Sequence, residues 1–307
     1  MQTLLACMPG VGTGPETHYF SRILPYLEQV AQPSFTDIQQ AITSIMFGDQ
    51  STDLDWDDLA DAFKQHDHPG LFVALLSQMG QRTQSELKLL LEKTPAHLRY
   101  IDELIETFPS ARFIVLLRDP RAIATSMLGY LPDLTQQERY SYLAKQARYV
   151  LDAFNSAHAA LARHPGQTRL IYFEQLLDNR DAALGELCEF LRLSFEPVSA
   201  DRFEAVAQAI VLPHEAHKAN NSRLDHQPDL LAWRKKLSLA EAIFLESLLI
   251  ERLTGWPYRW MTLPRRLLRV LRQPLLNWAK QLPEWQSMRM AQDTLLDQYR
   301  PWSPSTH

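Results

Sequence analysis

Two basic residues and a serine occupy positions where they could bind an anion. Lys93 ends one apolar run, Arg118 follows the run FIVLL at 113–117, and Ser126 comes soon after it. Ser126 lies seven residues beyond Asp119, which places both on nearly the same face of a helix, about 10 Å apart along its axis. Arg118 and the Ser126 hydroxyl could then hold one phosphate group, because guanidinium and hydroxyl donors both pair with phosphate oxygens.

The dipeptide Asp119-Pro120 is typical of a helix start. Asp can cap a helix N-terminus, and Pro at the first helical position gives up only an N–H group that would have no partner there. A helix N-terminus that faces the carboxyl end of a parallel strand binds phosphate, and an Arg adds a charge-assisted contact of about 1.5–3 kcal/mol. Taken alone, these residues fit equally well a capped core helix with Arg118 in solvent and Ser126 on the surface.

The segment Glu92-Lys93-Thr94-Pro95 adds a second cation. Lys93 also projects from the end of an apolar run, and Pro95 with His97 introduces the next predicted helix. The carboxyl ends of strands in an open α/β sheet meet at one edge, where ligands bind. Lys93 and Arg118 are therefore predicted to point at one anion site, whereas the alternative for Lys93 is an exposed lysine in a turn.

Most of the chain has the periodicity of amphipathic helices. Short apolar runs at 113–117 and 168–173, with a third at 89–93, are predicted strands, and each is followed by a helix-start signal. Strands that alternate with helices indicate a parallel sheet covered by helices, so the predicted fold class is α/β. The predicted helices are 17–31, 36–47, 57–65, 71–90, 97–108, 120–129, 136–163, 174–192, 201–211 and 239–253.

Composition and cysteine content narrow the classes of protein. The 307 residues carry a net charge of −5, which gives no general electrostatic footprint for nucleic acid. Only two cysteines are present, Cys7 and Cys188, and no His, Cys or carboxylate cluster has metal-ligand spacing. The N-terminus lacks the basic region of a signal peptide, and no apolar stretch reaches the roughly 18 residues of a membrane span. We predict a soluble, cytoplasmic protein without a metal or a nucleic-acid partner.

The block from Glu92 to Ser126 resembles the PAPS-dependent sulfotransferase family, in particular its bacterial and tyrosylprotein-type members. It contains an EKTP turn, a helix that ends in FPSA, a strand, and the motif RDPRAIATS. The resemblance covers roughly residues 1–258 and implies a three-layer fold like that of P-loop NTPases, with a short central parallel sheet flanked by many helices. Further similar features are IYFEQLL at 171–177, LLAWRKKLS at 230–238 and GWPY at 255–258.

The resemblance implies a cofactor and the residues that bind it. The donor would be PAPS, 3′-phosphoadenosine 5′-phosphosulfate, and the product PAP. In the family the Arg and Ser of the second motif bind the 3′-phosphate, which implies Arg118 and Ser126 here. The lysine of the first motif contacts the bridging oxygen or the sulfonate, which implies Lys93. Position 173 is often Tyr in the family, and Phe173 in this chain puts an adenine contact in doubt.

The start of the chain departs from the family pattern. Family members open with a strand and a P-[RK]-S-G-T-T loop that cradles the 5′-phosphosulfate. PGVGTG at 9–14 lacks the basic residue and the serine of that loop. A better register treats residues 1–9 as the helix that follows the loop, which places the loop upstream of Met1. Either the true start lies upstream, which we favour, or half of the cofactor site has been lost.

The same register singles out Glu16. The resemblance implies that Glu16 is the general base that takes the proton of the acceptor hydroxyl, a role that sulfuryl transfer needs. Its alternative is a carboxylate in the first turn of a helix, where the dipole favours it. His97 is the other base within reach, or else a residue at a helix N-terminus. His18 is a weaker candidate, as is the acidic group of Asp55, Asp57 and Asp58.

The composition changes near residue 264. We assign residues 1–263 to the sulfotransferase-like domain and 264–307 to a basic amphipathic tail. The part at 264–286 could lie on an anionic membrane or bind an acidic acceptor. We favour a short amphipathic helix packed on the domain, since prolines at 264, 274 and 283 limit its length.

Two functions follow from the sequence. The first is an enzyme that moves the sulfonate of PAPS to a hydroxyl of a carbohydrate, a tyrosine or a secondary metabolite. The second is a non-catalytic nucleotide-binding relative or a truncated remnant without the 5′-phosphosulfate loop. The acceptor pocket is expected in variable segments, here 32–90 and 127–150, so the sequence selects neither the acceptor, a small molecule or a glycan, nor the oligomeric state.

Overall fold

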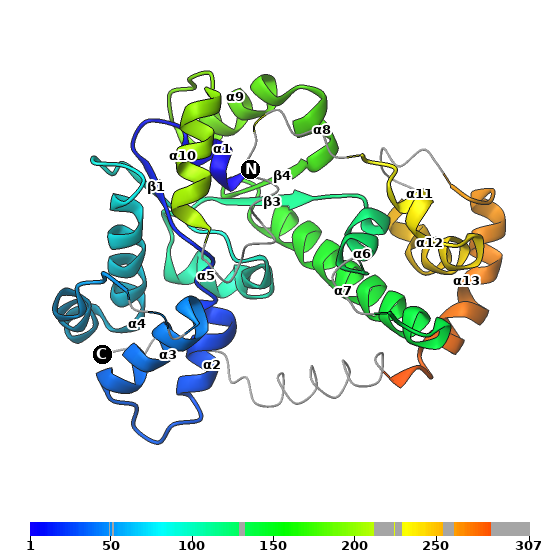
Figure 1. The fold of residues 1–307 in the computed structure, drawn as a ribbon, viewed down its shortest axis with the longest axis horizontal. Helices are drawn as coiled ribbons and strands as arrows, with labels where there is room; N and C mark the ends of the chain where they lie inside the picture. Colours follow the sequence, from blue (N-terminus) through cyan, green and yellow to red (C-terminus); the bar gives the residue numbers. More distant parts are fainter. Residues whose placement is uncertain are drawn as a thin grey trace. The chain divides into compact units, whose positions relative to one another are not determined.

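The computed structural model describes residues 1–48, 50, 52–128, 133–211, 224, 229–253 and 261–283. The chain forms two compact units: the first is Met1–Pro109 with Leu176–Gln227, and the second is Ser110–Gln175 with Pro228–His307. Each unit contains one pair of parallel strands among helices (Figure 1). The predicted α/β class, with small parallel sheets and many helices, is confirmed.

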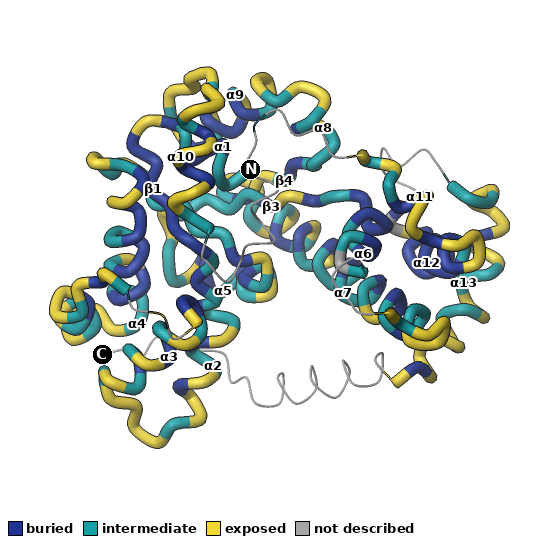
Figure 2. Tube along the Cα trace, viewed as in Figure 1, coloured by how far each residue is buried: buried dark blue, intermediate teal, exposed yellow. Residues whose placement is uncertain are grey.

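The first unit is built on strands β1 (Val11–Thr13) and β2 (Leu89–Leu91). They pair in parallel, with Val11 opposite Leu89 and Thr13 opposite Leu91. β1 is buried along its whole length, as Figure 2 shows. The helices of this unit are α1 (Gln2–Ala6), the π-helix η1 (Tyr19–Ile23), α2 (Leu24–Leu27), α3 (Phe35–Phe47), α4 (Trp56–Gln81), the 3-10 helix η2 (Pro95–Tyr100), α5 (Ile101–Thr107), α9 (Arg180–Leu191) and α10 (Ala200–Ile210).

Local sequence signals explain where several of these helices begin. Ser34 and Asp37 form a reciprocal capping box at the start of α3, and Asp55 accepts hydrogen bonds from two backbone N–H groups of α4. Inside α4 the backbone of Asp67 has φ 57° and ψ −153°, which breaks the helical path two residues before Pro69. The predicted helices 57–65 and 71–90 are therefore the two arms of one kinked element that ends at Gln81.

Strand β1 was not predicted from the sequence. It is held close to α4 because two glycines face each other: a Cβ on Gly12 would lie 2.9 Å from the Cα of Gly80. It would also lie 2.3 Å from Leu87 Cδ2. A three-residue strand is too short for a periodic signal, and the partners that stabilise it, β2 and α4, are distant in sequence.

The second unit is built on strands β3 (Phe113–Leu117) and β4 (Thr168–Tyr172). They pair in parallel over five residues, from Phe113 opposite Thr168 to Leu117 opposite Tyr172. Both strands match the predicted runs. The helices of this unit are α6 (Pro120–Leu128), α7 (Gln136–Arg163), α11 (Trp233–Lys236), α12 (Leu239–Leu253) and α13 (Arg265–Ala279), while α8 (Phe173–Asp178) directly follows β4.

Two helix predictions need correction. The single helix predicted at 174–192 is divided into α8 and α9, because the side chain of Asn179 accepts the Ala182 N–H and starts a new helix. The tail helix was expected to be short, but α13 runs for 15 residues with Pro274 inside it. It packs against α12 and α7, as predicted for a helix on the domain (Figure 1).

Within the described residues, no helix is both long enough and apolar enough to cross a membrane.

Candidate functional site

Glu16 and Lys93 meet at one end of the β1–β2 pair. Because Thr13 is opposite Leu91 in a parallel register, the segments that follow the two strands emerge at the same edge. Lys93 Nζ donates a hydrogen bond to Glu16 Oε1 in an ion pair. The Glu16 side chain is 15% exposed and that of Lys93 is 41% exposed, so a bound group could reach the lysine. The structure thus places a carboxylate and an ammonium group, both predicted from the sequence as site residues, in direct contact.

A buried carboxylate, Glu92, lies beside this pair. Its Oε1 accepts hydrogen bonds from the hydroxyls of Thr17, at 2.9 Å, and Thr94, at 2.5 Å. Its Oε2 lies 3.1 Å from His97 Nδ1. Burial by itself would raise the pKa of Glu92, but the hydrogen bonds from His97, Thr94 and Thr17 outweigh it and hold the pKa below its ordinary value. Glu92 is therefore kept as an acceptor for three donors.

His97 is fully engaged within the protein. The backbone N–H of Phe20 donates to His97 Nε2 at 3.3 Å, which leaves Nδ1 as the N–H that faces Glu92. The ring is buried and packs edge-on against the Phe20 ring, with centroids 5.4 Å apart. Both ring nitrogens are thus occupied, and this geometry favours a positioning role over the general-base role predicted as an alternative to Glu16.

His18 lies next to the Glu16–Lys93 pair. Its Nε2 is 3.8 Å from Glu16 Oε2, and its backbone has φ 50°, in the left-handed region. Burial lowers the pKa of His18, although the Glu16 carboxylate opposes that shift. The backbone N–H of His18 donates to Thr94 Oγ1 at 3.2 Å, so the turn that carries Glu16 is held to the segment after Lys93.

In the second unit, Arg118 follows β3 as predicted. Its guanidinium lies over the ring of Phe173, 4.7 Å from the centroid. A cation above an aromatic face is stabilised by the ring quadrupole, which fixes the orientation of the planar group. Phe173 therefore has a visible role as a support for Arg118. Ser126 is half-buried on α6, two turns beyond the start of that helix.

The start of α6 agrees with the predicted Asp-Pro signal. Asp119 Oδ1 accepts the backbone N–H of Arg121 at 2.9 Å, which caps the helix that opens at Pro120. The backbone N–H of Asp119 in turn donates to Glu174 Oε1 at 2.8 Å. Burial raises the pKa of Glu174, partly offset by this hydrogen bond and by the nearby charge of Arg118.

Arg121, also within the RDPR motif, has a structural role that sequence reasoning missed. Its side chain is 1% exposed and bridges Asp119 and Glu246 at 2.8 and 2.7 Å. The guanidinium also lies 4.2 Å from the centroid of the Trp233 ring. Arg121 therefore connects the start of α6 to α12 and α11. These contacts also fix the position of the backbone that follows Arg118.

The remaining residues that sequence reasoning missed are Thr17, Glu92 and Thr94. Thr17 is adjacent to Glu16, and Glu92 and Thr94 flank Lys93. Their position next to predicted site residues was the only signal in the sequence, and it does not predict the direction of a side chain. Within the described part of the chain, no group of three or more His, Cys, Asp or Glu residues could hold a metal ion.

Comparison with known proteins defines the class of this chain. The sulfotransferase family matches residues 1–197, which is more than half of the chain. The chain belongs to the sulfotransferase family. It is similar to the solved sulfotransferase domain from the curacin biosynthetic pathway, with 16% identity and a TM-score of 0.35, covering 77% of this chain and 92% of that domain. No curated protein sequence matches it.

Proposed function

We propose that this protein transfers the sulfonate group of PAPS to a hydroxyl group of a small-molecule or glycan acceptor. Family membership supports the transfer reaction. The observation that carries the proposal is the contact between Glu16 and Lys93 at the ends of two parallel strands. It supplies, side by side, the two charges that the reaction needs: a base for the acceptor and a cation for the leaving group.

The proposed reaction divides its work between these two residues. Glu16 accepts the proton of the acceptor hydroxyl while the acceptor oxygen forms a bond to sulfur. The bond between sulfur and the bridging oxygen of the 5′-phosphate breaks, and PAP leaves with the electron pair. Lys93 stabilises the negative charge that grows on that oxygen. No covalent bond to the protein is required, so the rate depends on positioning and charge.

Glu16 and Lys93 bond to each other in the structure, so the proposal requires the lysine to exchange partners. Binding of a phosphosulfate would place an anion next to the 41% exposed ammonium group, which can turn toward it. Glu16 would then be released to meet the acceptor. The residues present therefore fit the donor chemically.

We further propose that Arg118 and Ser126 bind the 3′-phosphate. The support from geometry is local to the second unit. Arg118 is held over Phe173, and Ser126 lies on a helix whose start is capped by Asp119. A guanidinium that is already oriented loses less conformational freedom when it binds a phosphate in a bidentate manner.

Finer features of the proposal come from the sequence. They are a three-layer arrangement like that of P-loop NTPases, a sulfotransferase domain over 1–263, and a cytoplasmic location.

Calorimetric titration with PAP, together with transfer of labelled sulfonate from PAPS to phenols, sugars and tyrosine peptides, tests the proposal. We expect the wild-type protein to bind PAP and to label one acceptor class. Binding without transfer to any acceptor would identify the non-catalytic nucleotide-binding relative. Failure to bind PAP would overturn the cofactor assignment.

A further inference from the structure

We infer that Glu92 is a positioning residue that sets the geometry of the Glu16–Lys93 pair, an inference that rests on the proposed sulfotransferase function. Glu92 immediately precedes Lys93 in the chain, and its side chain is only 15% exposed. Its carboxylate accepts hydrogen bonds from Thr17, Thr94 and His97 within the protein. Its role is therefore to hold other groups.

The hydrogen bonds of Glu92 connect the neighbours of both reacting residues. Thr17, the residue after Glu16, donates to Glu92, the residue before Lys93. Two further bonds run between the same segments, from the His18 N–H to Thr94 Oγ1 and from the Phe20 N–H to His97 Nε2. The segment that follows Glu16 is thus fixed to the segments on both sides of Lys93.

A carboxylate suits this position better than an amide. All three side-chain groups around Glu92 act as donors, since His97 Nε2 accepts a backbone N–H and leaves its Nδ1–H for Glu92. An amide has one oxygen and one NH₂ group, so in a glutamine either the NH₂ group meets the His97 Nδ1–H or the hydroxyls of Thr17 and Thr94 lose the oxygen that accepts them both. The buried group left without a partner would push the two segments apart.

Threonine 17 offers a matched pair of variants. Thr17→Val keeps the shape of this buried side chain and removes the hydroxyl, whereas Thr17→Ser keeps the hydroxyl. The inference predicts that Thr17→Val and Glu92→Gln lower kcat, while PAP affinity stays near that of the wild type. A displacement of about 1 Å of a reacting group costs roughly 10²-fold in rate. Thr17→Ser restores the wild-type value.

A second readout does not depend on turnover. Acetylation of each lysine by N-hydroxysuccinimide acetate, followed by peptide mass spectrometry, reports how firmly Lys93 is held by Glu16. We expect Lys93 to be acetylated about several-fold faster in Glu92→Gln and Thr17→Val than in Thr17→Ser, because a charge-assisted bond of Lys93 is weakened in the first two variants. Lys64, whose side chain is 72% exposed, is the internal control and should not change.

The two readouts separate the inference from the function on which it rests. Unchanged Lys93 reactivity in folded Glu92→Gln and Thr17→Val proteins would overturn the positioning role, whatever the enzyme does. Altered Lys93 reactivity in a chain that transfers no sulfonate would overturn the proposed function and leave the positioning role standing. Thermal melting identifies any variant that has lost its fold. If Glu92→Gln is unfolded, the comparison of Thr17→Val with Thr17→Ser tests the inference instead.

A second inference comes independently from α13: the geometry points to this helix as a contact with an anionic lipid surface. Its packed face includes Leu268 and Ala279, both fully buried. A separate apolar stripe stays exposed, with Leu267 at 45%, Val270 at 72% and Trp278 at 40%. Successive spacings of three and eight residues place these side chains along one helix face.

The charge of α13 selects the partner. The helix carries four arginines, at 265, 266, 269 and 272, and no carboxylate, in a chain whose net charge is −5. Arg269 has a half-exposed partner, Glu251, at 3.5 Å. At about 100° per residue, Arg266 lies next to the stripe and the other three arginines lie on the remaining sides of the helix. A helix with Leu, Val and Trp on one side and arginines on the others is the type that lies in the interface of an anionic bilayer.

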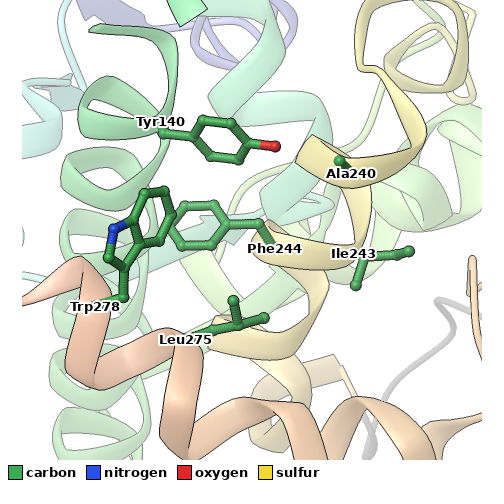
Figure 3. A pocket seen from close by; sticks show the side chains of 6 residues that line it. All are labelled: Tyr140, Ala240, Ile243, Phe244, Leu275 and Trp278. Atoms are coloured by element: carbon green, nitrogen blue, oxygen red, sulfur yellow. The ribbon is translucent and has the colours of Figure 1, made fainter. Parts of the chain in front are cut away.

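Trp278 extends the apolar surface into a pocket at the end of the helix. The pocket has a volume of about 360 Å³. Its lining is shown in Figure 3 and consists of Tyr140, Ala240, Ile243, Phe244, Leu275 and Trp278. The Trp278 ring packs edge-on against Tyr140 and Phe244 at 5.3 and 5.2 Å, so it is held rigidly at this surface. A tryptophan in this setting suits the boundary between headgroups and acyl chains.

Sedimentation with vesicles tests the contact. We expect the wild type to bind vesicles of phosphatidylcholine with phosphatidylglycerol, and to bind neutral phosphatidylcholine vesicles at least about tenfold more weakly. Val270→Glu should weaken binding to the same extent, whereas Val73→Glu, at a 44% exposed valine on α4, should not. Equal binding by both variants, or none by the wild type, would overturn the inference. So would a dimer that Val270→Glu dissociates, because a second copy would then cover the stripe.

Discussion

At the scale of single residues, the candidate site consists of three charged side chains and the hydrogen-bond donors around one of them. Glu16 and Lys93 bond to each other, and Glu92 gathers Thr17, Thr94 and His97 behind them. Two carboxylates close to one lysine thus have different partners: Glu16 pairs with the lysine itself, and the buried Glu92 binds Thr17, Thr94 and His97.

Replacing Glu16 by Gln tests the proposed base. The amide keeps the size of the side chain but cannot take a proton, so we expect turnover to fall roughly 10²–10⁴-fold. PAP affinity should stay within a small factor of the wild type. Titration calorimetry and initial rates measure the two quantities. Full activity in Glu16→Gln would remove this residue from the mechanism.

Replacing Arg118 by Ala tests the proposed phosphate contact. Loss of a charge-assisted hydrogen bond of about 1.5–3 kcal/mol corresponds to PAP binding that is roughly 10–100-fold weaker. Arg169→Ala, an exposed arginine on β4, is the matched control and should leave PAP affinity unchanged. Equal affinities for the two variants would show that Arg118 does not bind PAP.

Glu92 also predicts how stability depends on pH. Its pKa in the folded protein is depressed below the ordinary value of 4.5, so the unfolded chain binds the proton more readily. The stability from Glu92 is therefore fully present above pH 4.5 and is lost as pH falls through the folded pKa. Urea unfolding between pH 7 and pH 3 should show a smaller acid loss in Glu92→Gln. An identical pH profile would contradict this role.

At the scale of elements, the position of Glu16 depends on the close approach of β1 to α4. We expect Gly12→Ala to destabilise the protein by about 1–3 kcal/mol, because the new methyl group meets the backbone of Gly80 at 2.9 Å. A Cβ on Gly185 in α9 meets nothing within 4 Å, so Gly185→Ala should be neutral or stabilise by up to about 1 kcal/mol. Chemical denaturation measures both, and equal stabilities would contradict the packing argument.

At the scale of the whole molecule, each unit has its own stabilising interactions. In the first unit, Val11 of β1 packs in an apolar cluster with Met8 and Cys188, and Leu90 of β2 packs against a larger cluster that includes Tyr19 and Leu75. In the second unit, buried ion pairs of Arg121 with Asp119 and Glu246 connect α6 to α12. The family match over residues 1–197 spans parts of both units.

The buried bridge predicts a large effect on stability. Arg121→Ala leaves two buried carboxylates without their cation, which typically costs about 3–5 kcal/mol. Arg269→Ala removes a half-exposed pair with Glu251 and should cost at most about 1 kcal/mol. Guanidinium denaturation of the two variants checks the difference. A small effect for Arg121→Ala would mean that water or a nearby group replaces the lost cation.

The sequence by itself determined the features that depend on neighbours along the chain. Asp119 and Pro120 marked the start of α6, the run 113–117 marked β3, and the RDPR and EKTP motifs indicated the family. Helix caps and short apolar runs depend on residues that are close together in the chain, so they can be recognised from the sequence alone.

Only the tertiary structure decided which side chains act together. β1 exists because it pairs with residues 78 positions away, as in Val11 with Leu89. The bonds of Thr17 to Glu92 and of Arg121 to Glu246 join segments 75 and 125 residues apart. The direction of a hydroxyl or a guanidinium depends on the partner that folding brings to it, and no local signal encodes that partner. For this reason the sequence predicted Glu16 and Lys93 as site residues, whereas the contacts of Glu92 with Thr17, Thr94 and His97 became visible only in the structure.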